Sequence, residues 1–348
     1  MSFTRAWDFS AEICDLEVMT DGSTPVERSN TQVNTGSYSW KSSTLSSAIV
    51  MGVPDGTVDL RAGYFLWVSD DAGWGNDGIR GDMNVFAVHQ RWETDFGVRL
   101  IWMEDERRLD LSIDGVVQDT IALPAEWVIE TWFHIGITAS YTSGYASAYF
   151  NGDRILNYVG AITQQPWDAV FLFQRRETFG TQNGAWLDDG YVDVMVGESD
   201  TAPPMYKFLP SYVLSAGADA EFTPLSGSNY QMVDDGPGED GDTTYNKAAT
   251  SAGSLKDTFN CDSIALPTDY ILVAAHPFVV TRKLDAGEDA QIINTAWDGA
   301  TLAEGDAQDV PIAYGFKKTR MTTQPDGEDW NEDDFNAMQF GYEAAGSF

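Results

Sequence analysis

Glu130-Thr-Trp-Phe-His-Ile-Gly-Ile-Thr-Ala139, followed by Ala146-Ser-Ala-Tyr-Phe-Asn-Gly152, decides the fold class of this chain. From Phe133 onward, apolar residues alternate with polar or small ones, and this period of two is typical of a β-strand. The second segment ends on Asn151-Gly152, a pair that readily adopts the positive φ of a tight hairpin turn. The sequence therefore predicts antiparallel strands here.

The same signals recur over the first two hundred residues. Leu109 to Ile113 alternates apolar and polar residues before the turn pair Asp114-Gly115, which predicts a hairpin with one wet and one buried face. Val170 to Phe173 and Val192 to Val196 are further strand candidates. No segment shows a sustained helical period, and turn residues recur about every ten positions. We expect an all-β chain, with a jelly-roll sandwich followed by a second, smaller β domain.

A length of 348 residues allows two hydrophobic cores. The stretch from Gly197 to Pro204 lacks an apolar pattern and contains two prolines, so it is predicted to be an extended connector between domains at 1–200 and 203–348. In the second domain, Tyr270 to Ala275 and Phe278 to Thr281 are predicted strands. Pro277 interrupts them and marks a sheet edge or a bulge, because proline cannot donate to a strand ladder.

The charge of the chain excludes some partners. It has 20 Lys and Arg against 54 Asp and Glu, a net charge of -34 that repels nucleic acids and anionic membrane surfaces. No apolar stretch approaches the roughly 18–20 residues that cross a bilayer, and the amino terminus has no signal-peptide pattern. Cys14 and Cys261 give no disulfide framework, and no zinc-ligand spacing is present. We expect no nucleic-acid partner, no membrane insertion and no required cofactor.

Two acidic, glycine-rich loops are the candidate ligand sites. Calcium prefers several oxygen ligands, and a sugar prefers an aromatic platform beside hydrogen-bonding groups. The alternative for both is ordinary turn chemistry, with Trp74 in the core or a subunit contact and the later loop in an interface. The later loop lacks the spacing of an EF-hand. The candidates are Trp74, Asn76 and Asp77 for a sugar, and Asp70, Asp71, Asp234, Asp235, Asp240 and Asp242 for calcium.

The segments 130–139 and 146–152 resemble the paired strands of concanavalin A-like, laminin-G-like jelly rolls, where a Trp-x-His strand precedes one ending in Tyr-x-Asn-Gly. The segment Trp186-Leu-Asp-Asp-Gly-Tyr-Val-Asp-Val-Met-Val196 resembles the last strand of that family. The resemblance covers the first domain and implies a sandwich with Trp132 and Phe133 between its sheets.

Jelly rolls of this type include glycoside hydrolases with a Glu-x-Asp-x-x-Glu strand, in which two carboxylates share one face. Glu93-Thr-Asp95 begins like this motif, but Gly97-Val98 follows where the second Glu should stand. His134 has no nucleophile motif beside it and is interpreted as a packed or surface residue. We therefore predict no catalytic residues and no enzymatic activity.

The second domain resembles one that is common in tailed-bacteriophage virion proteins. The resemblance lies in Asn229-Tyr-Gln-Met-Val-Asp-Asp235, Asp242-Thr-Thr-Tyr245, Asp257-Thr-Phe259, and the closing stretches Thr323 to Trp330 and Met338 to Gly341. Asn331 stands where that family usually has Thr.

These observations support a non-enzymatic phage virion structural protein in the tail, fibre or capsid surface. Its lectin-like domain would face a host glycan, and its second domain would bind other virion proteins or further copies of itself, with a homotrimer as the expected oligomer. Sheet edges such as the one near Pro277 are expected assembly surfaces. The chain would be made in the host cytoplasm and carried on the virion. The alternatives are a microbial carbohydrate-binding or adhesion module and a polysaccharide depolymerase.

Overall fold

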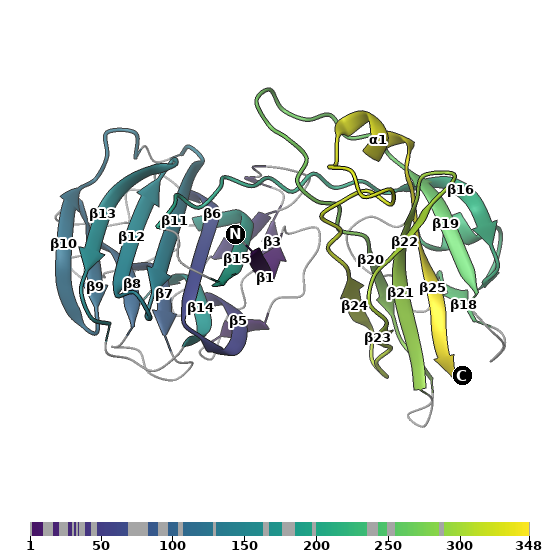
Figure 1. Cartoon of the computed structure of the whole chain (residues 1–348), viewed down its shortest axis with the longest axis horizontal. Helices are drawn as coiled ribbons and strands as arrows, with labels where there is room; N and C mark the ends of the chain where they lie inside the picture. The colour runs from purple at the N-terminus through teal and green to yellow at the C-terminus, as the bar shows by residue number, and fades with distance from the viewer. Residues whose placement is uncertain are drawn as a thin grey trace. The chain divides into compact units, whose positions relative to one another are not determined.

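The computed structural model divides into two compact units, residues 1–208 and 209–348. Strands dominate both units, which confirms the predicted all-β fold class (Figure 1). No helix in the described part of the chain is long and apolar enough to cross a bilayer. The structure describes residues 2–9, 17–20, 27–29, 31, 32, 34, 39–42, 47–68, 83–89, 97–103, 107–127, 130–162, 167–175, 185–196, 200–234, 243–248, 255–284 and 289–347.

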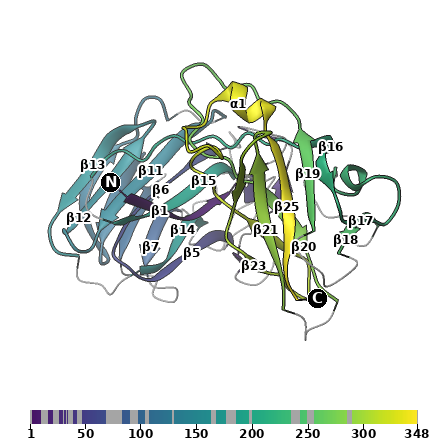
Figure 2. The ribbon, with the colours of Figure 1, turned by 45° about the vertical axis from the view of Figure 1, so that its right-hand side comes forward.

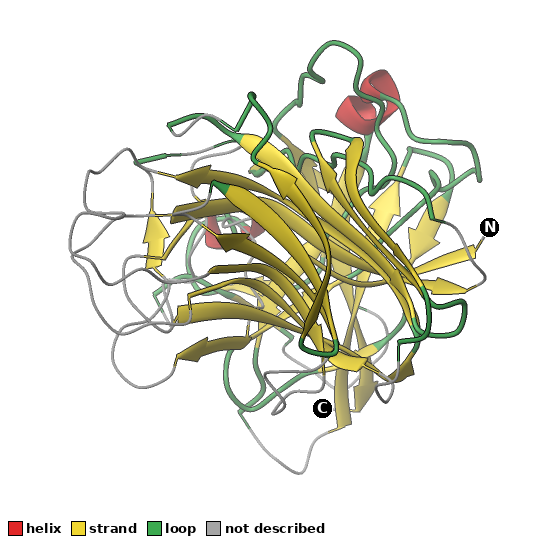
Figure 3. Ribbon diagram, turned by 90° about the vertical axis from the view of Figure 1, so that its left-hand side faces the viewer, coloured by secondary structure: helices red, strands yellow, loops and turns green. Residues whose placement is uncertain are grey.

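The first unit is a sandwich of two antiparallel sheets, which lie face to face in Figure 3. One sheet has the order β13 (Asp153–Val159), β12 (Tyr145–Phe150), β11 (Phe133–Ser140), β6 (Asp59–Val68), β15 (Ala185–Val196), β4 (Ser39–Ser42) and β3 (Glu27–Ser29), with β1 (Ser2–Phe9) paired to β15. The other has the order β10 (Val116–Ala122), β9 (Arg108–Ile113), β8 (Val98–Met103), β7 (Met83–His89), β14 (Trp167–Arg175), β5 (Ser47–Thr57) and β2 (Glu17–Thr20).

The two predicted turn pairs form as expected. Asp114 and Gly115 have φ values of 49° and 80° between β9 and β10, and Asn151 and Gly152 have φ values of 48° and 89°. Positive φ at both central residues matches the right-handed twist of the flanking strands. The second pair leads from β12 to a further strand, β13, whereas β11 and β12 are joined through residues 141–144.

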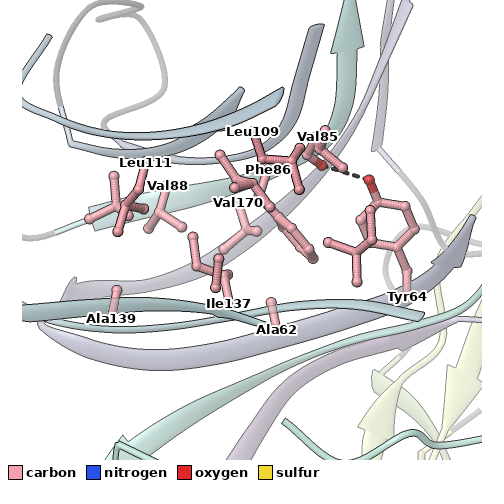
Figure 4. Close-up of a cluster of buried hydrophobic side chains, with 14 of the residues drawn as sticks. Ala62, Tyr64, Val85, Phe86, Val88, Leu109, Leu111, Ile137, Ala139 and Val170 are labelled. Carbon is pink, nitrogen blue, oxygen red and sulfur yellow. Dashed lines mark hydrogen bonds between the residues drawn. The ribbon is translucent and has the colours of Figure 1, made fainter. Parts of the chain in front are cut away.

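The core of the first unit fills the space between the two sheets (Figure 4). The Tyr64 hydroxyl donates to the Val85 carbonyl, 2.6 Å away on the other sheet, and burial raises the pKa of Tyr64 well above its usual value. Phe133 packs in this core as expected, but Trp132 is only half-buried. The Trp127 ring instead packs against the Phe133 ring, with 4.5 Å between the two ring centroids.

The prediction that one face of β9 is exposed to solvent is wrong, because Asp110 and Ser112 are each only 1% exposed. Asp110 is buried with its charge compensated: the Arg108 guanidinium donates to both carboxylate oxygens at 2.8 and 3.0 Å, and the Thr120 hydroxyl donates at 2.5 Å. The alternation of the sequence correctly separates the two faces of the strand, but it does not reveal that both faces are covered.

The second unit contains a six-stranded sheet and two two-stranded ribbons (Figure 2). Its sheet has the order β16 (Val213–Ala220), β19 (Lys256–Cys261), β25 (Gln339–Ser347), β21 (Asp289–Trp297) and β22 (Leu302–Glu304), with β23 (Gln308–Asp309) paired to β21. The ribbons are β17 (Thr223–Pro224) with β18 (Asn246–Lys247), and β20 (Phe278–Thr281) with β24 (Gly315–Lys318). A 3-10 helix, η1 (Asn229–Met232), and an α-helix, α1 (Glu332–Ala337), complete the described elements.

The second unit lacks one predicted strand and contains one short capped helix. The predicted strand from Tyr270 to Ala275 is wrong, since only Ala275 pairs there, in an isolated bridge to Met321. Asn331 is the N-cap of α1, and its side chain accepts a hydrogen bond from the Asp334 backbone N–H at 2.9 Å. Asn is among the preferred N-cap residues, because its side-chain oxygen can accept from a backbone N–H of the first helical turn.

Replacing Ile137 by Ala tests the sandwich core. Ile137 has no exposed surface, so the lost contacts and the resulting cavity should lower the free energy of unfolding by about 2–5 kcal/mol. Val159→Ala is the matched control, because Val159 is 77% exposed in a strand of the same unit and should change stability by less than about 0.5 kcal/mol. Urea denaturation measures both; equal effects would contradict the assigned core.

Candidate functional site

The loops predicted to bind sugar or calcium lie almost entirely outside the described residues. None of the candidate residues of the first loop is described. Of the candidate carboxylates of the second loop only Asp234 is described, and its side chain is exposed. The described residues contain no group of three or more His, Cys, Asp or Glu that could hold a metal ion. Calcium and sugar binding at these loops therefore stay predictions. Outside the described ranges are Asp70, Asp71, Trp74, Asn76, Asp77, Asp235, Asp240 and Asp242, and also Glu93 and Asp95.

The Leu-Asp-Asp-Gly motif of the first unit forms a bulge in β15 that anchors other parts of the chain. The register of β15 on β6 shifts between Asp188 and Tyr191, and Asp189 has a φ of 52°. Both Asp side chains are fully buried. Asp189 accepts from the Asn34 side-chain amide at 2.7 Å, and Asp188 accepts from the Asn34 backbone N–H at 3.1 Å. The paired carboxylates therefore hold a distant segment in place.

Residues 200–208, which we call the strap, lie on the outer face of the β11 sheet. The strap carbonyl of Thr201 accepts from the Thr138 hydroxyl at 3.1 Å, and that of Pro204 accepts from the Tyr191 hydroxyl at 2.8 Å. The Phe208 N–H donates to Asp189 at 2.9 Å. The stretch predicted as a connector at 197–204 therefore packs on the first unit from Asp200 onward. Backbone groups make most of these contacts, so the side-chain pattern gave no signal of them.

His134 is buried on the same sheet face as the strap contacts. Its side chain has no exposed surface, and a Cβ added to Gly63 would lie 2.7 Å from His134 Nε2. Its ring is 5.2 Å from the Phe65 ring, and neither ring nitrogen has a hydrogen-bond partner. Burial lowers the pKa of His134 to about 3, so the imidazole is neutral near pH 7. The residue is packed, as one of the two sequence interpretations held.

In the second unit, several segments converge on one buried carboxylate, Asp257. Asp257 Oδ1 accepts from the backbone N–H groups of Glu221 and Phe222 at 2.8 and 3.1 Å. Asp257 Oδ2 accepts from the side-chain amides of Asn229 and Asn246 at 2.7 and 3.2 Å. Four donors from three separate segments thus surround a residue with no exposed surface. Such a carboxylate is a structural centre, since its lone pairs are already used.

The closing strand β25 completes this centre. The Tyr342 hydroxyl donates to Asp257 Oδ2 at 3.3 Å and accepts from the Asn246 amide at 2.8 Å, and its pKa is raised by burial and by the Asp257 charge. A Cβ on Gly341 would lie 2.0 Å from the Asp257 carbonyl oxygen, so only glycine allows this approach of β25 to β19. The Asn246 and Tyr342 contacts join segments that are far apart in sequence, and no local pattern predicted them.

No family model matches the sequence, and no curated protein is detectably similar to it. Among solved structures, the receptor-binding domain of botulinum neurotoxin C/D mosaic serotype is similar with a TM-score of 0.37 and 14% identity, over 51% of this chain and 42% of that one. The carbohydrate-binding module CBM66 from Bacillus subtilis has a TM-score of 0.33 and 8% identity, over 48% of this chain and 91% of that one. A Trypanosoma rangeli sialidase in complex with sialic acid has a TM-score of 0.39 and 10% identity, over 53% of this chain and 30% of that one.

The matched region spans less than half of the botulinum domain and less than a third of the sialidase. TM-scores below 0.5 do not establish a shared function, and the assignment of this chain as all-β rests on its own strands.

His134 should make the stability of the first unit depend on pH. Its folded-state pKa of about 3 lies below the ordinary value of 6.5, so the stability is complete above pH 6.5 and is lost as the pH falls toward 3. Between pH 6.5 and 4 the wild type should lose about 3 kcal/mol more than His134→Leu, in which this titration is absent. Urea denaturation at several pH values measures the difference, and the carboxylates common to both proteins cancel. Parallel pH profiles would contradict the burial of this imidazole.

Asp257→Asn should destabilise the second unit by about 3 kcal/mol, because one acceptor oxygen becomes an amide donor that faces other donors. Asp329→Asn removes the same charge from an exposed side chain and should cost less than about 0.5 kcal/mol. Thermal unfolding of both variants, followed by tryptophan fluorescence and calorimetry, measures the contrast. A neutral Asp257→Asn would mean that the carboxylate is not a structural centre.

Proposed function

We propose that the chain is a non-enzymatic structural and binding protein of a tailed-bacteriophage virion, in its tail, fibre or capsid surface. In this proposal the first unit presents its loops to a host-surface glycan. The second unit binds other virion proteins and further copies of the chain as a homo-oligomer. The protein is made in the host cytoplasm and reaches the outside on the particle.

One observation supports the non-enzymatic part of this proposal: three carboxylates of the recognised motifs are engaged in internal hydrogen bonds. Asp188, Asp189 and Asp257 are each fully buried and accept from fixed donors. A hydrolytic acid or nucleophile has to reach the substrate, which these three residues do not. The motifs therefore support a scaffold that acts through its surface.

A second observation favours assembly. The second unit exposes large apolar side chains on segments without regular strands, including Ile271 at 79% and Leu284 at 84%. Large exposed apolar side chains are candidate positions for contact with another molecule. A microbial carbohydrate-binding module remains the alternative, with the glycan contact of the first unit as its main activity.

Immunogold electron microscopy of purified phage particles tests the virion assignment. An antibody against the whole chain should label one defined part of each particle, and a particle preparation from a phage with this gene deleted is the control. Absence of label from intact particles would overturn the assignment. Binding of the purified full chain to a glycan array, without label on particles, would favour the carbohydrate-binding alternative.

A further inference from the structure

The strap packs on the first unit with side chains as well as with backbone carbonyls. Pro203 is buried, and a Cβ added to Gly136 would lie 2.8 Å from its ring. Tyr206 packs edge-on against Tyr191, with 4.8 Å between the two ring centroids. Gly136 is two residues along β11 from His134, so both face the same side of the sheet. The strap therefore lies over the sheet beside His134.

The strap also contacts a neighbour of His134 on the next strand. Phe65 is the cross-strand partner of His134 on β6, and the two rings are 5.2 Å apart. The Lys207 ammonium of the strap lies 5.6 Å from the centroid of the Phe65 ring. A Cβ added to Gly63 would lie 2.7 Å from His134 Nε2 and 3.0 Å from the Tyr191 ring, which brings these two side chains together. The strap thus contacts neighbours of the imidazole on β11, β6 and β15.

The imidazole of His134 is poorly served by this environment. It has no exposed surface, and neither ring nitrogen has a hydrogen-bond partner among the described residues. The backbone of His134 is well held, because its N–H donates to the Asn151 side chain at 2.8 Å and its carbonyl accepts from the Asn151 N–H at 2.9 Å. A buried polar ring without partners costs free energy, and a charged one costs more. The ring gains partners when it reaches water.

The charged and titratable groups around the ring would not hold a proton on it. Arg61 pairs with Asp193 at 3.0 Å, and Asp188 accepts from two backbone N–H groups. Lys207 is the one cation of the strap, and its charge would oppose a second positive charge on His134. The described groups of this kind on the surrounding elements are Arg61 on β6, Tyr149 on β12, Asp188 and Tyr191 on β15, and Tyr206 and Lys207 in the strap.

The strap is held by separate contacts and not by a strand ladder. Its carbonyls accept from the Thr138 and Tyr191 hydroxyls, and the Phe208 N–H donates to Asp189. The sheet below is different, because β11 pairs along its length with β12 and with β6. Local opening follows the weakest contacts of a fold. Lifting the strap therefore brings water to the ring at a lower cost than separating the strands.

We propose that the strap is an acid-released latch, in which protonation of His134 lifts residues 200–208 from the sheet and lengthens the free chain between the two units. With the strap docked, the second unit begins directly after Phe208. With the strap lifted, its nine residues can extend over about 30 Å. This proposal does not depend on the virion assignment.

Acid is the direction that releases the strap. Burial under the docked strap lowers the pKa of His134 to about 3, whereas a ring in water has its ordinary value of 6.5. Docking is therefore unaffected by this group above pH 6.5 and weakens about tenfold for each pH unit from there toward 3. The carboxylates of Asp189 and Asp200 also hold the strap, and loss of their charge would act in the same direction.

Hydrogen exchange at the Phe208 amide tests the latch, because this N–H bonds to Asp189 only while the strap is docked. In the full wild-type chain its protection factor, corrected for the intrinsic pH dependence of exchange, should fall about 100-fold between pH 7.5 and 4.5. Lifting the strap exposes little surface, so this protection should change little in 1 M urea, whereas that of Ile137 in β11 should fall. A Phe208 protection that is independent of pH, or that depends on urea like Ile137, would overturn the proposal.

Two variants separate the titration from the packing. His134→Leu, with His134→Gln as a second non-titrating variant, should show a pH-dependent fall at Phe208 at least about tenfold smaller than the wild type. Thr138→Val removes one hydrogen bond to the strap and should lower the protection about 2–10-fold at both pH values, with the pH dependence kept. A full wild-type pH dependence in both His134 variants would show that the carboxylates, and not His134, release the strap.

Discussion

The fold depends on buried carboxylates in which both oxygen atoms accept hydrogen bonds. An unpaired buried charge costs several kcal/mol, so each buried Asp needs hydrogen-bond donors around it. Asp257 meets this constraint with five donors, including two backbone N–H groups that cannot rotate away. Asp188 and Asp189 meet it with Asn34 and with the strap. Each carboxylate thereby joins segments that the strand ladders alone would leave separate.

The same constraint limits the chemistry that Asp188, Asp189 and Asp257 can perform. A carboxylate that holds three segments together has little freedom to accept a proton or attack a substrate. The paired Asp residues of β15 shape a bulge, and bulges commonly redirect a strand and the chain that follows it. The two-stranded ribbon of β20 and β24 packs on the core of the second unit through Val279.

The sequence predicted the positions of the strands better than it predicted which side chains are buried by other parts of the chain. Alternation located β9, β11 and β15, and the positive-φ pairs Asp114-Gly115 and Asn151-Gly152 located two turns, because both signals come from neighbours in the chain. The interruption at Pro277 was also predictable: proline lacks the N–H that a ladder needs, and Pro277 separates the isolated bridge between Ala275 and Met321 from the paired residues of β20 and β24. The burial of Asp110 and His134 was not, because it depends on what lies over the sheet face. Likewise, no local sequence pattern indicated that Asn246 and Tyr342 contact the buried Asp257 carboxylate.

The sequence by itself determined the all-β class, the two hairpin turns and the acidic charge, because local backbone preference and composition fix these properties. Only the tertiary structure decided that residues 200–208 cover a sheet face and that the first unit extends to Phe208. It alone also brought Asn229, Asn246 and Asp257 together. The physical reason is that hydrogen bonds and burial between distant segments depend on their positions in space, which no local pattern of side chains encodes.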